Sequence, residues 1–317
     1  MAGARKRSRI DFNMEVKEVN KETGRVTGIM IPDPKRYEWR EENGERCLFD
    51  KFDKTLIPWK IVLEAFDEAI NKMNGLPIYH QPQKIKDADE YISTRISSIR
   101  EMLRTPEPKI DITFKDKSEE FLEALKSNKL GFSIMSIDLV GSTKLATTMS
   151  SEKYGKLIQV LLFEMSHVIP KFHGHVLKYT GDGLIAYFPE PSFVLKADLA
   201  LDCALTIRKL VYTTLNPLLI EQGFEKIDIR MGLDAGEAYI VVIGSPETKQ
   251  HKDIIGEVVN LATKIQSHAE VGGIYIGDIM QRNLHTNWRI HCHEISIDND
   301  WEYKDDEGNQ YKIYKIE

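Results

Sequence analysis

Two aspartates stand where this chain could bind phosphate groups and act on them. Asp138 ends the apolar run Phe132 to Ile137, and Asp182 lies between two glycines in the stretch LKYTGDGLIAYF. The apolar runs predict strands, and the glycine-flanked turn predicts a hairpin. An aspartate with no chemical role would also fit this turn, because aspartate is common in turns. In a split βαβ arrangement the first strand and the hairpin are neighbours, so we expect the two carboxylates to lie side by side.

Small residues follow Asp138 and open the next predicted helix. Free backbone N–H groups at such a turn bind phosphate, and two hard carboxylates beside them form a site for Mg²⁺ or Mn²⁺. The carbonyl oxygen of Leu139 is a candidate for a further metal ligand. Two metal ions roughly 4 Å apart would stabilise the attacking and leaving oxygens of an in-line displacement at phosphorus. The residues expected to bind phosphate are Gly141, Ser142 and Thr143.

The elements that must position these residues alternate from about residue 130 onward. Strands are predicted at 132–137, on both sides of the GDG turn, and at 227–233, 238–243, 273–276 and 311–316; helices are predicted at 151–169, 193–215 and 257–268. The order β-α-β-β-α-β predicts an α+β fold with a ferredoxin-like core, its sheet covered by helices on one face. Residues 130–317 form this predicted functional domain.

Residues 1–129 are predicted to be an N-terminal extension of mixed, partly helical structure, and its role is unknown. Residues 1–54 are polar and irregular, with a turn signal at Glu42-Asn43-Gly44, and helices are predicted at 58–74, 87–103 and 118–126. The segment Thr105-Pro106-Glu107-Pro108 is the best candidate for a linker.

Composition excludes several classes of protein. The net charge of −6 over 317 residues does not favour nucleic-acid binding. No apolar run approaches the roughly 18 residues that span a bilayer, and the basic N-terminus has no apolar segment behind it, so it does not resemble a secretory signal. Three widely spaced cysteines fit a reducing compartment. We expect a cytoplasmic protein with no membrane or nucleic-acid partner.

Four motifs, in this order, resemble those of the class III nucleotidyl cyclases. IDLVGSTKL and KYTGDGLIAYF resemble the two metal motifs, IRMGLDAGEAYIVVIG the glycine-rich hairpin, and DIIGEVVNLATKI the dimer-interface helix. The resemblance covers roughly residues 130–317 and implies a class III cyclase catalytic domain. It implies that a nucleoside triphosphate is converted to a 3′,5′-cyclic monophosphate and pyrophosphate, with two Mg²⁺ or Mn²⁺ ions held by Asp138 and Asp182.

The resemblance also assigns roles to residues beyond the metal motifs. Asn260 matches the residue that positions the ribose, and Lys264 stands where the family usually has an arginine on the departing phosphate oxygens. Four residues apart on a helix, the two share a face, although a plain exposed polar face would look the same. Lysine keeps the charge of arginine but loses its bidentate fork. Lys304 is expected as a phosphate anchor, although the usual Lys-Gly pair is absent there.

The family forms dimers whose sites lie at the interface, so the resemblance implies a homodimer. One protomer would supply the metal aspartates and its partner Lys178, Asp253, Asn260 and Lys264. An apolar stripe on the 257–268 helix is compatible with such an interface, as it is with packing inside one chain.

Lys178 and Asp253 indicate which base the enzyme recognises. They match the two positions that contact the base in the purine cyclases of this family, and the combination of lysine and aspartate resembles that of adenylate cyclases. An aspartate can accept from an exocyclic amine and a lysine can donate to a ring nitrogen or carbonyl, which also suits cytosine. Three other features resemble the Pycsar pyrimidine cyclases of bacterial anti-phage defence. LDAGEA stands in place of the usual histidine-serine-glycine, Lys264 stands in place of arginine, and the chain has an N-terminal extension. Tyr179 could fill the volume of a purine's second ring or be a core strand tyrosine.

The sequence thus predicts a pyrimidine cyclase that acts on UTP or CTP and makes a second messenger, cyclic UMP or cyclic CMP, read by a separate effector. Three alternatives remain open. They are an adenylate cyclase, an inactive nucleotide-binding regulator, and a palm-type polymerase or diguanylate cyclase, which also sets two acids around two metals.

Overall fold

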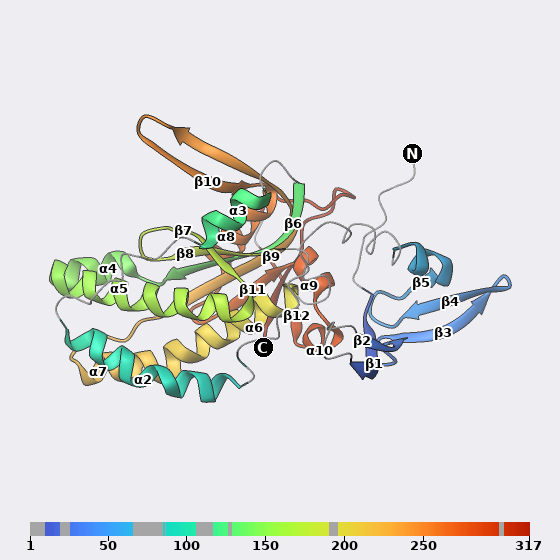
Figure 1. The fold of residues 1–317 in the computed structure, drawn as a ribbon, viewed down its shortest axis with the longest axis horizontal. Helices are drawn as coiled ribbons and strands as arrows, with labels where there is room; N and C mark the ends of the chain where they lie inside the picture. Colours follow the sequence, from blue (N-terminus) through green and yellow to red (C-terminus); the bar gives the residue numbers. More distant parts are fainter. Residues whose placement is uncertain are drawn as a thin grey trace. The chain divides into compact units, whose positions relative to one another are not determined.

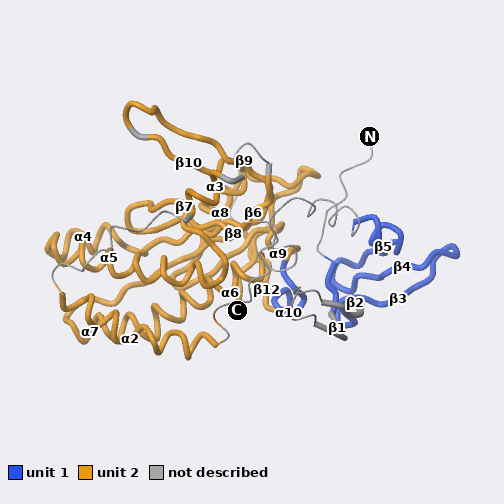
Figure 2. The backbone as a smooth tube through the Cα atoms, viewed as in Figure 1, with its two compact units in different colours: residues 1–79, 284–290 blue, residues 80–283, 291–317 orange. Residues whose placement is uncertain are grey.

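The computed structural model describes residues 10–19, 26–65, 85, 87–105, 117–125, 129–189, 196–297 and 301–317. The chain forms two compact units (Figure 2). The first unit comprises residues 1–79 and 284–290, and the second unit comprises residues 80–283 and 291–317. The second unit therefore begins earlier than the predicted domain, and it includes two helices that the sequence assigned to the extension.

The first unit is built from strands where the sequence predicted irregular structure. Its strands are β1 (Phe12–Val19) and β2 (Val26–Pro32), which form an antiparallel pair, and β3 (Tyr37–Glu42), β4 (Glu45–Asp50) and β5 (Thr55–Pro58), which form an antiparallel sheet. The turn predicted at Asn43-Gly44 joins β3 to β4, and both residues have positive φ (54° and 77°), as a two-residue hairpin turn requires. A helix begins at residue 59, one residue after the predicted start, because Pro58 ends β5; it is described to residue 65, and the rest of the predicted helix lies outside the described residues.

A short segment from late in the chain completes the first unit. Helix α10 (Thr286–Arg289) lies between α9 (Asp278–Asn283) and β12 (Cys292–Ile295) in sequence. The backbone N–H and hydroxyl of Thr286 donate to Asp11 Oδ2 over 3.1 and 2.8 Å, and Arg289 Nη2 donates to Asp53 Oδ1 over 2.9 Å. Asp11 also accepts from the fully buried Arg36, so the segment is part of one buried polar network.

The second unit contains a large mixed sheet in the order β12-β13-β11-β9-β6-β8-β7 (Figure 1). The central strand β6 is antiparallel to both β8 and β9, β11 runs parallel to β9, and β10 pairs with the distal part of β9 to form a two-stranded ribbon. The chain order β6-α-β7-β8-α-β9 confirms the predicted βαββαβ core. The strands are β6 (Lys129–Leu139), β7 (His175–Tyr179), β8 (Leu184–Pro189), β9 (Ile229–Ser245), β10 (Lys249–Ile255), β11 (Ile274–Gly277) and β13 (Ile313–Ile316).

Helices cover both faces of this sheet, so the prediction of one covered face was wrong. In Figure 1, α5 and α6 lie on one side of the strands and α8 on the other. Gly232 of β9 explains the close approach of α8, because a Cβ atom there would lie 2.6 Å from the Cα of Gln266. The helices are α2 (Ala88–Arg104), α3 (Lys117–Leu125), α4 (Ser142–Thr148), α5 (Ser151–Val168), α6 (Lys196–Leu210), α7 (Asn216–Glu221) and α8 (Glu257–His268), with helical turns at Ile169–Phe172 and Val211–Leu215.

Helix α2, predicted within one residue of its observed ends, belongs to the second unit. Asp87 caps its N-terminus by accepting from the N–H groups of Asp89 and Glu90. Arg95 donates from Nε and Nη2 to the fully buried carboxylate of Glu164 on α5, over 3.0 and 2.8 Å.

Within the described residues, no helix is both long and apolar enough to cross a membrane.

Candidate active site

The structure brings Asp138 and the GDG turn together at one end of β6 and β8. In the β6–β8 register Ile137 lies opposite Leu184, and one further step along the two strands sets Asp138 opposite Gly183. A Cβ atom on Gly183 would clash with the carbonyl oxygen of Ile137 and lie 3.2 Å from the Cα of Asp138. Glycine is therefore required here, because it lets the turn that carries Asp182 close directly against Asp138.

The carboxylate of Asp138 already has two partners that the sequence did not reveal. Arg230 donates to Oδ2 from Nη2 over 3.0 Å and from Nε over 3.3 Å, and Gln266 of α8 donates to the same oxygen over 3.3 Å. Arg230 stands directly opposite Asp138 in the β6–β9 register. The contact of Arg230 with Asp138 can be predicted from the sequence only if the strand that contains IDL is known to pair with the strand that contains IRM.

The two neighbouring aspartates suit a hard divalent cation. Both side chains are partly exposed, so carboxylate oxygens face solvent at the end of the sheet. No group of three or more histidine, cysteine, aspartate or glutamate side chains among the described residues could hold a metal ion alone. A cation here would need further oxygens from water, a backbone carbonyl such as that of Leu139, or a phosphate.

The predicted phosphate loop lies beside the same turn. Gly141 adopts the left-handed conformation (φ 69°, ψ 24°) that precedes α4, whose first N–H groups have no partner within the helix. Tyr154 of α5 links the loop to the turn: burial and then the charge of Asp182 raise its pKa, and its hydrogen bond with Ser142 lowers it. Ser142 thus contacts a tyrosine whose pKa also responds to the charge of Asp182.

The two residues predicted to read the base are in contact. Lys178 Nζ lies 2.6 Å from Asp253 Oδ2; the lysine side chain is 40% exposed and the aspartate 7%. A β-bulge between Val176 and Lys178 sets Lys178 opposite Ile185, whereas His175 lies opposite Tyr187. The bulge thus turns Lys178 to the same face of the sheet as His175, which strict alternation would not do.

Tyr179 points to the other face of β7. It is 56% exposed, and its hydroxyl shares a hydrogen bond of 2.9 Å with Ser166 Oγ of α5. The interpretation of Tyr179 as a core tyrosine is therefore wrong. Its contact with α5 also directs it away from Lys178, so this arrangement does not favour a role as the wall of a base pocket.

Asn260 and Lys264 are both exposed on α8, as their predicted shared face requires. The apolar stripe of the same helix is buried within the unit, so it gives no independent support for a dimer. Its members Val258, Val259, Ala262 and Ile265 are at most 8% exposed.

Lys304 lies exposed on the hairpin between Trp301 and Tyr311. Trp301 Nε1 donates to the carbonyl of Tyr311 over 2.9 Å, and both rings pack in one cluster with Leu261 and Ile265 of α8. The hairpin therefore rests against the helix that carries Asn260 and Lys264. The structure does not place the Lys304 side chain on any of the other predicted site residues.

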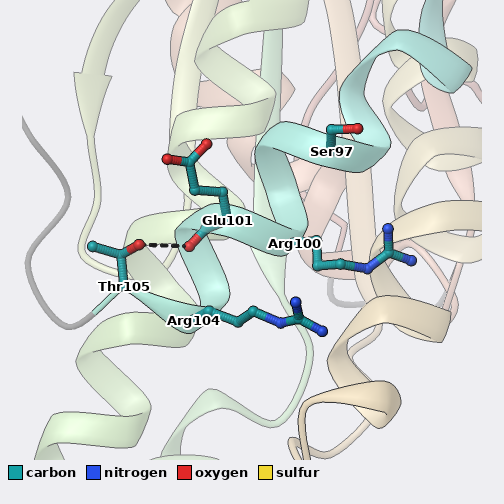
Figure 3. Close-up of a pocket in the computed structure, with 5 residues that line it drawn as sticks. All are labelled: Ser97, Arg100, Glu101, Arg104 and Thr105. Carbon is teal, nitrogen blue, oxygen red and sulfur yellow. Dashed lines mark hydrogen bonds between the residues drawn. The ribbon is translucent and has the colours of Figure 1, made fainter.

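A surface pocket of about 300 Å³ lies along the C-terminal half of α2 (Figure 3). It contains none of the predicted site residues, and Arg100, which lines it, forms a bidentate ion pair with Glu221. The residues that line it are Ser97, Arg100, Glu101, Arg104 and Thr105.

A comparison with known protein families assigns this part of the chain to one of them. Residues 126–314 match the adenylate and guanylate cyclase catalytic domain. The chain belongs to this cyclase family. The match covers both aspartates, the predicted phosphate loop, the Lys178–Asp253 pair and α8, and it confirms the resemblance drawn from the four motifs.

Individual relatives include cytidylate and adenylate cyclases. The cytidylate cyclase of Escherichia coli is 26% identical over 235 residues, which are 71% of this chain and 50% of that protein. The cytidylate cyclase of Staphylococcus aureus is 27% identical over 157 residues, 47% of this chain and 36% of that protein. The chain thus spans half or less of the length of these relatives. The adenylyl cyclase CyaB from P. aeruginosa matches in structure with a TM-score of 0.52 and 25% identity, over 60% of this chain and 95% of that structure.

Proposed function

We propose that this cyclase-family protein converts a pyrimidine nucleoside triphosphate, CTP or UTP, to its 3′,5′-cyclic monophosphate and pyrophosphate. The observation that carries the proposal is the placement of Asp138 and the Asp182 turn side by side, next to the phosphate loop. The resemblance of the chain to two cytidylate cyclases supports a pyrimidine substrate.

In the proposed reaction the ribose 3′-oxygen attacks the α-phosphorus and releases its proton to solvent, while the bond between the α-phosphorus and the oxygen that bridges it to the β-phosphate breaks and pyrophosphate leaves with that oxygen. The residues of this chain would act by binding and alignment. The N–H groups after Gly141 would hold phosphate oxygens, Asn260 would orient the ribose, and Lys264 and Lys304 would offset the charge that develops on the leaving group. Two divalent ions held by Asp138 and Asp182 would supply Lewis acidity to the 3′-hydroxyl and the phosphates.

The Lys178–Asp253 pair supports a base with an amine next to a ring acceptor. Asp253 would accept from the amine and Lys178 would donate to the neighbouring ring nitrogen or carbonyl. Cytosine presents this pattern and uracil has no amine, so within the proposal CTP is placed before UTP. Adenine presents an equivalent pattern, and for this reason adenylate cyclase is the second candidate.

We further propose that the active form is a homodimer, with each site shared between two protomers. Asn260 and Lys264 lie exposed on α8, and the β9–β10 ribbon exposes large apolar side chains that a second copy could cover. These side chains are Tyr239, Val242, Ile243 and Ile255.

Mixing two inactive variants tests the shared site. Asp138→Asn and Asn260→Ala chains, combined in equal amounts, should regain about a quarter of wild-type activity, because half of the dimers are mixed and each mixed dimer has one intact site. If subunit exchange is confirmed and activity does not return, each site lies within one chain.

The substrate is tested by incubating the protein separately with ATP, GTP, CTP and UTP in the presence of Mn²⁺ and separating the products by chromatography. We expect cyclic CMP or cyclic UMP with pyrophosphate, and loss of several orders of magnitude in turnover for Asp138→Asn and Asp182→Asn. A preference for ATP would make the protein an adenylate cyclase. Binding without pyrophosphate release would make it an inactive regulator, and a linear or two-base product would indicate a palm-type enzyme.

The role in the cell follows from the product and is part of the same proposal. A cyclic pyrimidine nucleotide would serve as a second messenger for a separate effector, as in the Pycsar systems of anti-phage defence that the motifs resemble. Loss of phage resistance in cells that carry Asp182→Asn would support it, and unchanged resistance would contradict it.

A further inference from the structure

The short helix α3, which precedes β6 and is labelled in Figure 1, contacts β7 and β10, the two strands that carry the proposed base-reading residues. Toward β10, the carboxylates of Glu123 and Glu119 lie 2.8 and 3.5 Å from Lys252 Nζ. Lys252 immediately precedes Asp253, and successive residues of a strand point to opposite sides. The helix therefore braces the side of β10 that is opposite the Lys178–Asp253 contact.

Toward β7 and β8, the same helix makes an aromatic stack. The ring of Phe121 lies 4.8 Å from that of His175, and the ring of His175 lies 5.1 Å from that of Tyr187, both pairs nearly parallel. A hydrogen bond of 3.1 Å joins Ser118 Oγ to the hydroxyl of Tyr187. His175 opens β7, and Lys178 follows it across the bulge.

The need for such a brace follows from the sheet order. β7 pairs with β8 at one edge, and β10 pairs with the distal part of β9, so among the described strands no backbone ladder joins β7 to β10. The 2.6 Å contact between Lys178 and Asp253 therefore depends on side chains and on elements that touch both strands. Helix α3 is such an element.

We infer that α3 is a positioning element for base recognition: it sets the separation of β7 and β10 and hence the geometry of Lys178 and Asp253. This inference rests on the proposed function, because it assumes that the pair reads the base. We do not expect any α3 side chain to touch the nucleotide. The helix acts through the two strands.

The test compares Phe121→Ala and Lys252→Met with matched controls in the full chain. Phe163→Ala removes another phenylalanine–histidine stack, that of Phe163 on His167 of α5, and Lys312→Met removes another lysine–glutamate pair, that of Lys312 with Glu294 over 2.8 Å. Phe121→Tyr keeps the stack with His175 and serves as the conservative variant.

The first readout is kcat/KM for each of the four triphosphates. Phe121→Ala should lower kcat/KM for the preferred triphosphate about two- to tenfold, mainly through KM, and bring the four values closer together, since one such contact contributes at the level of other aromatic pairs. Lys252→Met should lower kcat/KM for the preferred triphosphate about two- to fivefold, the range of a solvent-accessible ion pair, because both partner carboxylates are exposed. Phe121→Tyr and both controls should keep the wild-type ratios. Equal losses for all four triphosphates, or unchanged ratios, would overturn the inference.

The second readout does not depend on activity. Amide hydrogen exchange in β7 and β10 should be faster in Phe121→Ala than in wild type and unchanged in Phe163→Ala. If wild type cyclises no triphosphate, the proposed function fails, and the exchange measurement alone decides on α3. Unchanged exchange in both strands would then reject the positioning role, whereas faster exchange would support it.

Discussion

Replacing Asp234 with asparagine should change how the stability of the second unit depends on pH. Asp234 of β9 is fully buried, and its carboxylate accepts from the hydroxyl of Tyr311 over 2.9–3.0 Å and from the N–H groups of Ala235 and Met280 over 2.8 and 3.3 Å. Burial raises the pKa of Asp234 to about 7, even though these hydrogen bonds oppose the shift. Asparagine keeps an acceptor oxygen but cannot take up a proton.

The direction and size of the effect follow from this pKa. Because the folded value is above that of the unfolded chain, the folded state holds a proton that the unfolded state has released. This contribution to stability is present at low pH and is lost as the pH rises through 7. With a folded pKa of about 7, the loss between pH 5 and pH 8 amounts to about 2.5–3 kcal/mol.

Urea unfolding followed by circular dichroism at pH 5, 6, 7 and 8 measures this difference directly. Relative to wild type, Asp234→Asn should gain about 2.5–3 kcal/mol between pH 5 and pH 8, with most of the change below pH 7. Asp306→Asn, which removes an exposed carboxylate, is the control. If the difference between wild type and Asp234→Asn is the same at pH 5 and pH 8, Asp234 does not titrate in this range and the argument from burial is wrong.

Three further predictions concern the site and the core. Gly183→Ala would clash with the β6 backbone, so turnover should fall at least about tenfold while circular dichroism stays native; near-wild-type kcat would contradict the close packing of the turn. Glu164→Gln removes the buried negative charge that pairs with Arg95, and should lower the unfolding free energy in urea by about 3–5 kcal/mol; a loss below about 1 kcal/mol would mean that this pair contributes no more than an exposed ion pair. Lys178→Ala leaves the buried Asp253 unpaired, so kcat/KM for the preferred triphosphate should fall about tenfold to a hundredfold and discrimination among the four should flatten; an unchanged ranking would remove Lys178 from base reading.

Long periodic segments explain which parts of the fold were predictable. Helices α2, α5 and α8 were predicted within one or two residues, because each carries a continuous apolar stripe with clear ends. The strands of the first unit were missed. The sequence of β3 is YEWREE, and five of its six residues are exposed, so it lacks the alternation of apolar and polar residues that predicts a strand. Arg36, which immediately precedes β3, is buried and pairs with Asp11 and Asp50, which lie 25 and 14 positions away in the sequence.

The candidate site also has features that the sequence predicts and features that it does not. The adjacency of Asp138 and Asp182 follows from strand order, which the sequence pattern indicates. The direction of Lys178 does not, because it depends on a one-residue bulge that no local pattern marks. Arg230 was missed because its role depends on cross-strand register. The two-sided covering of the sheet was missed because the apolar stripe of α8 does not show which face of the sheet it meets.

The return of the chain to the first unit at residues 284–290 limits how this protein can be divided. A fragment that begins at residue 80 would still carry Thr286 and Arg289 but would lack Asp11 and Asp53, the carboxylates that receive their hydrogen bonds. The two units are thus joined by three chain crossings, and a single cut leaves both incomplete. For the same reason, exchange of the first unit between homologues by recombination would need matching changes in two separate stretches of the gene.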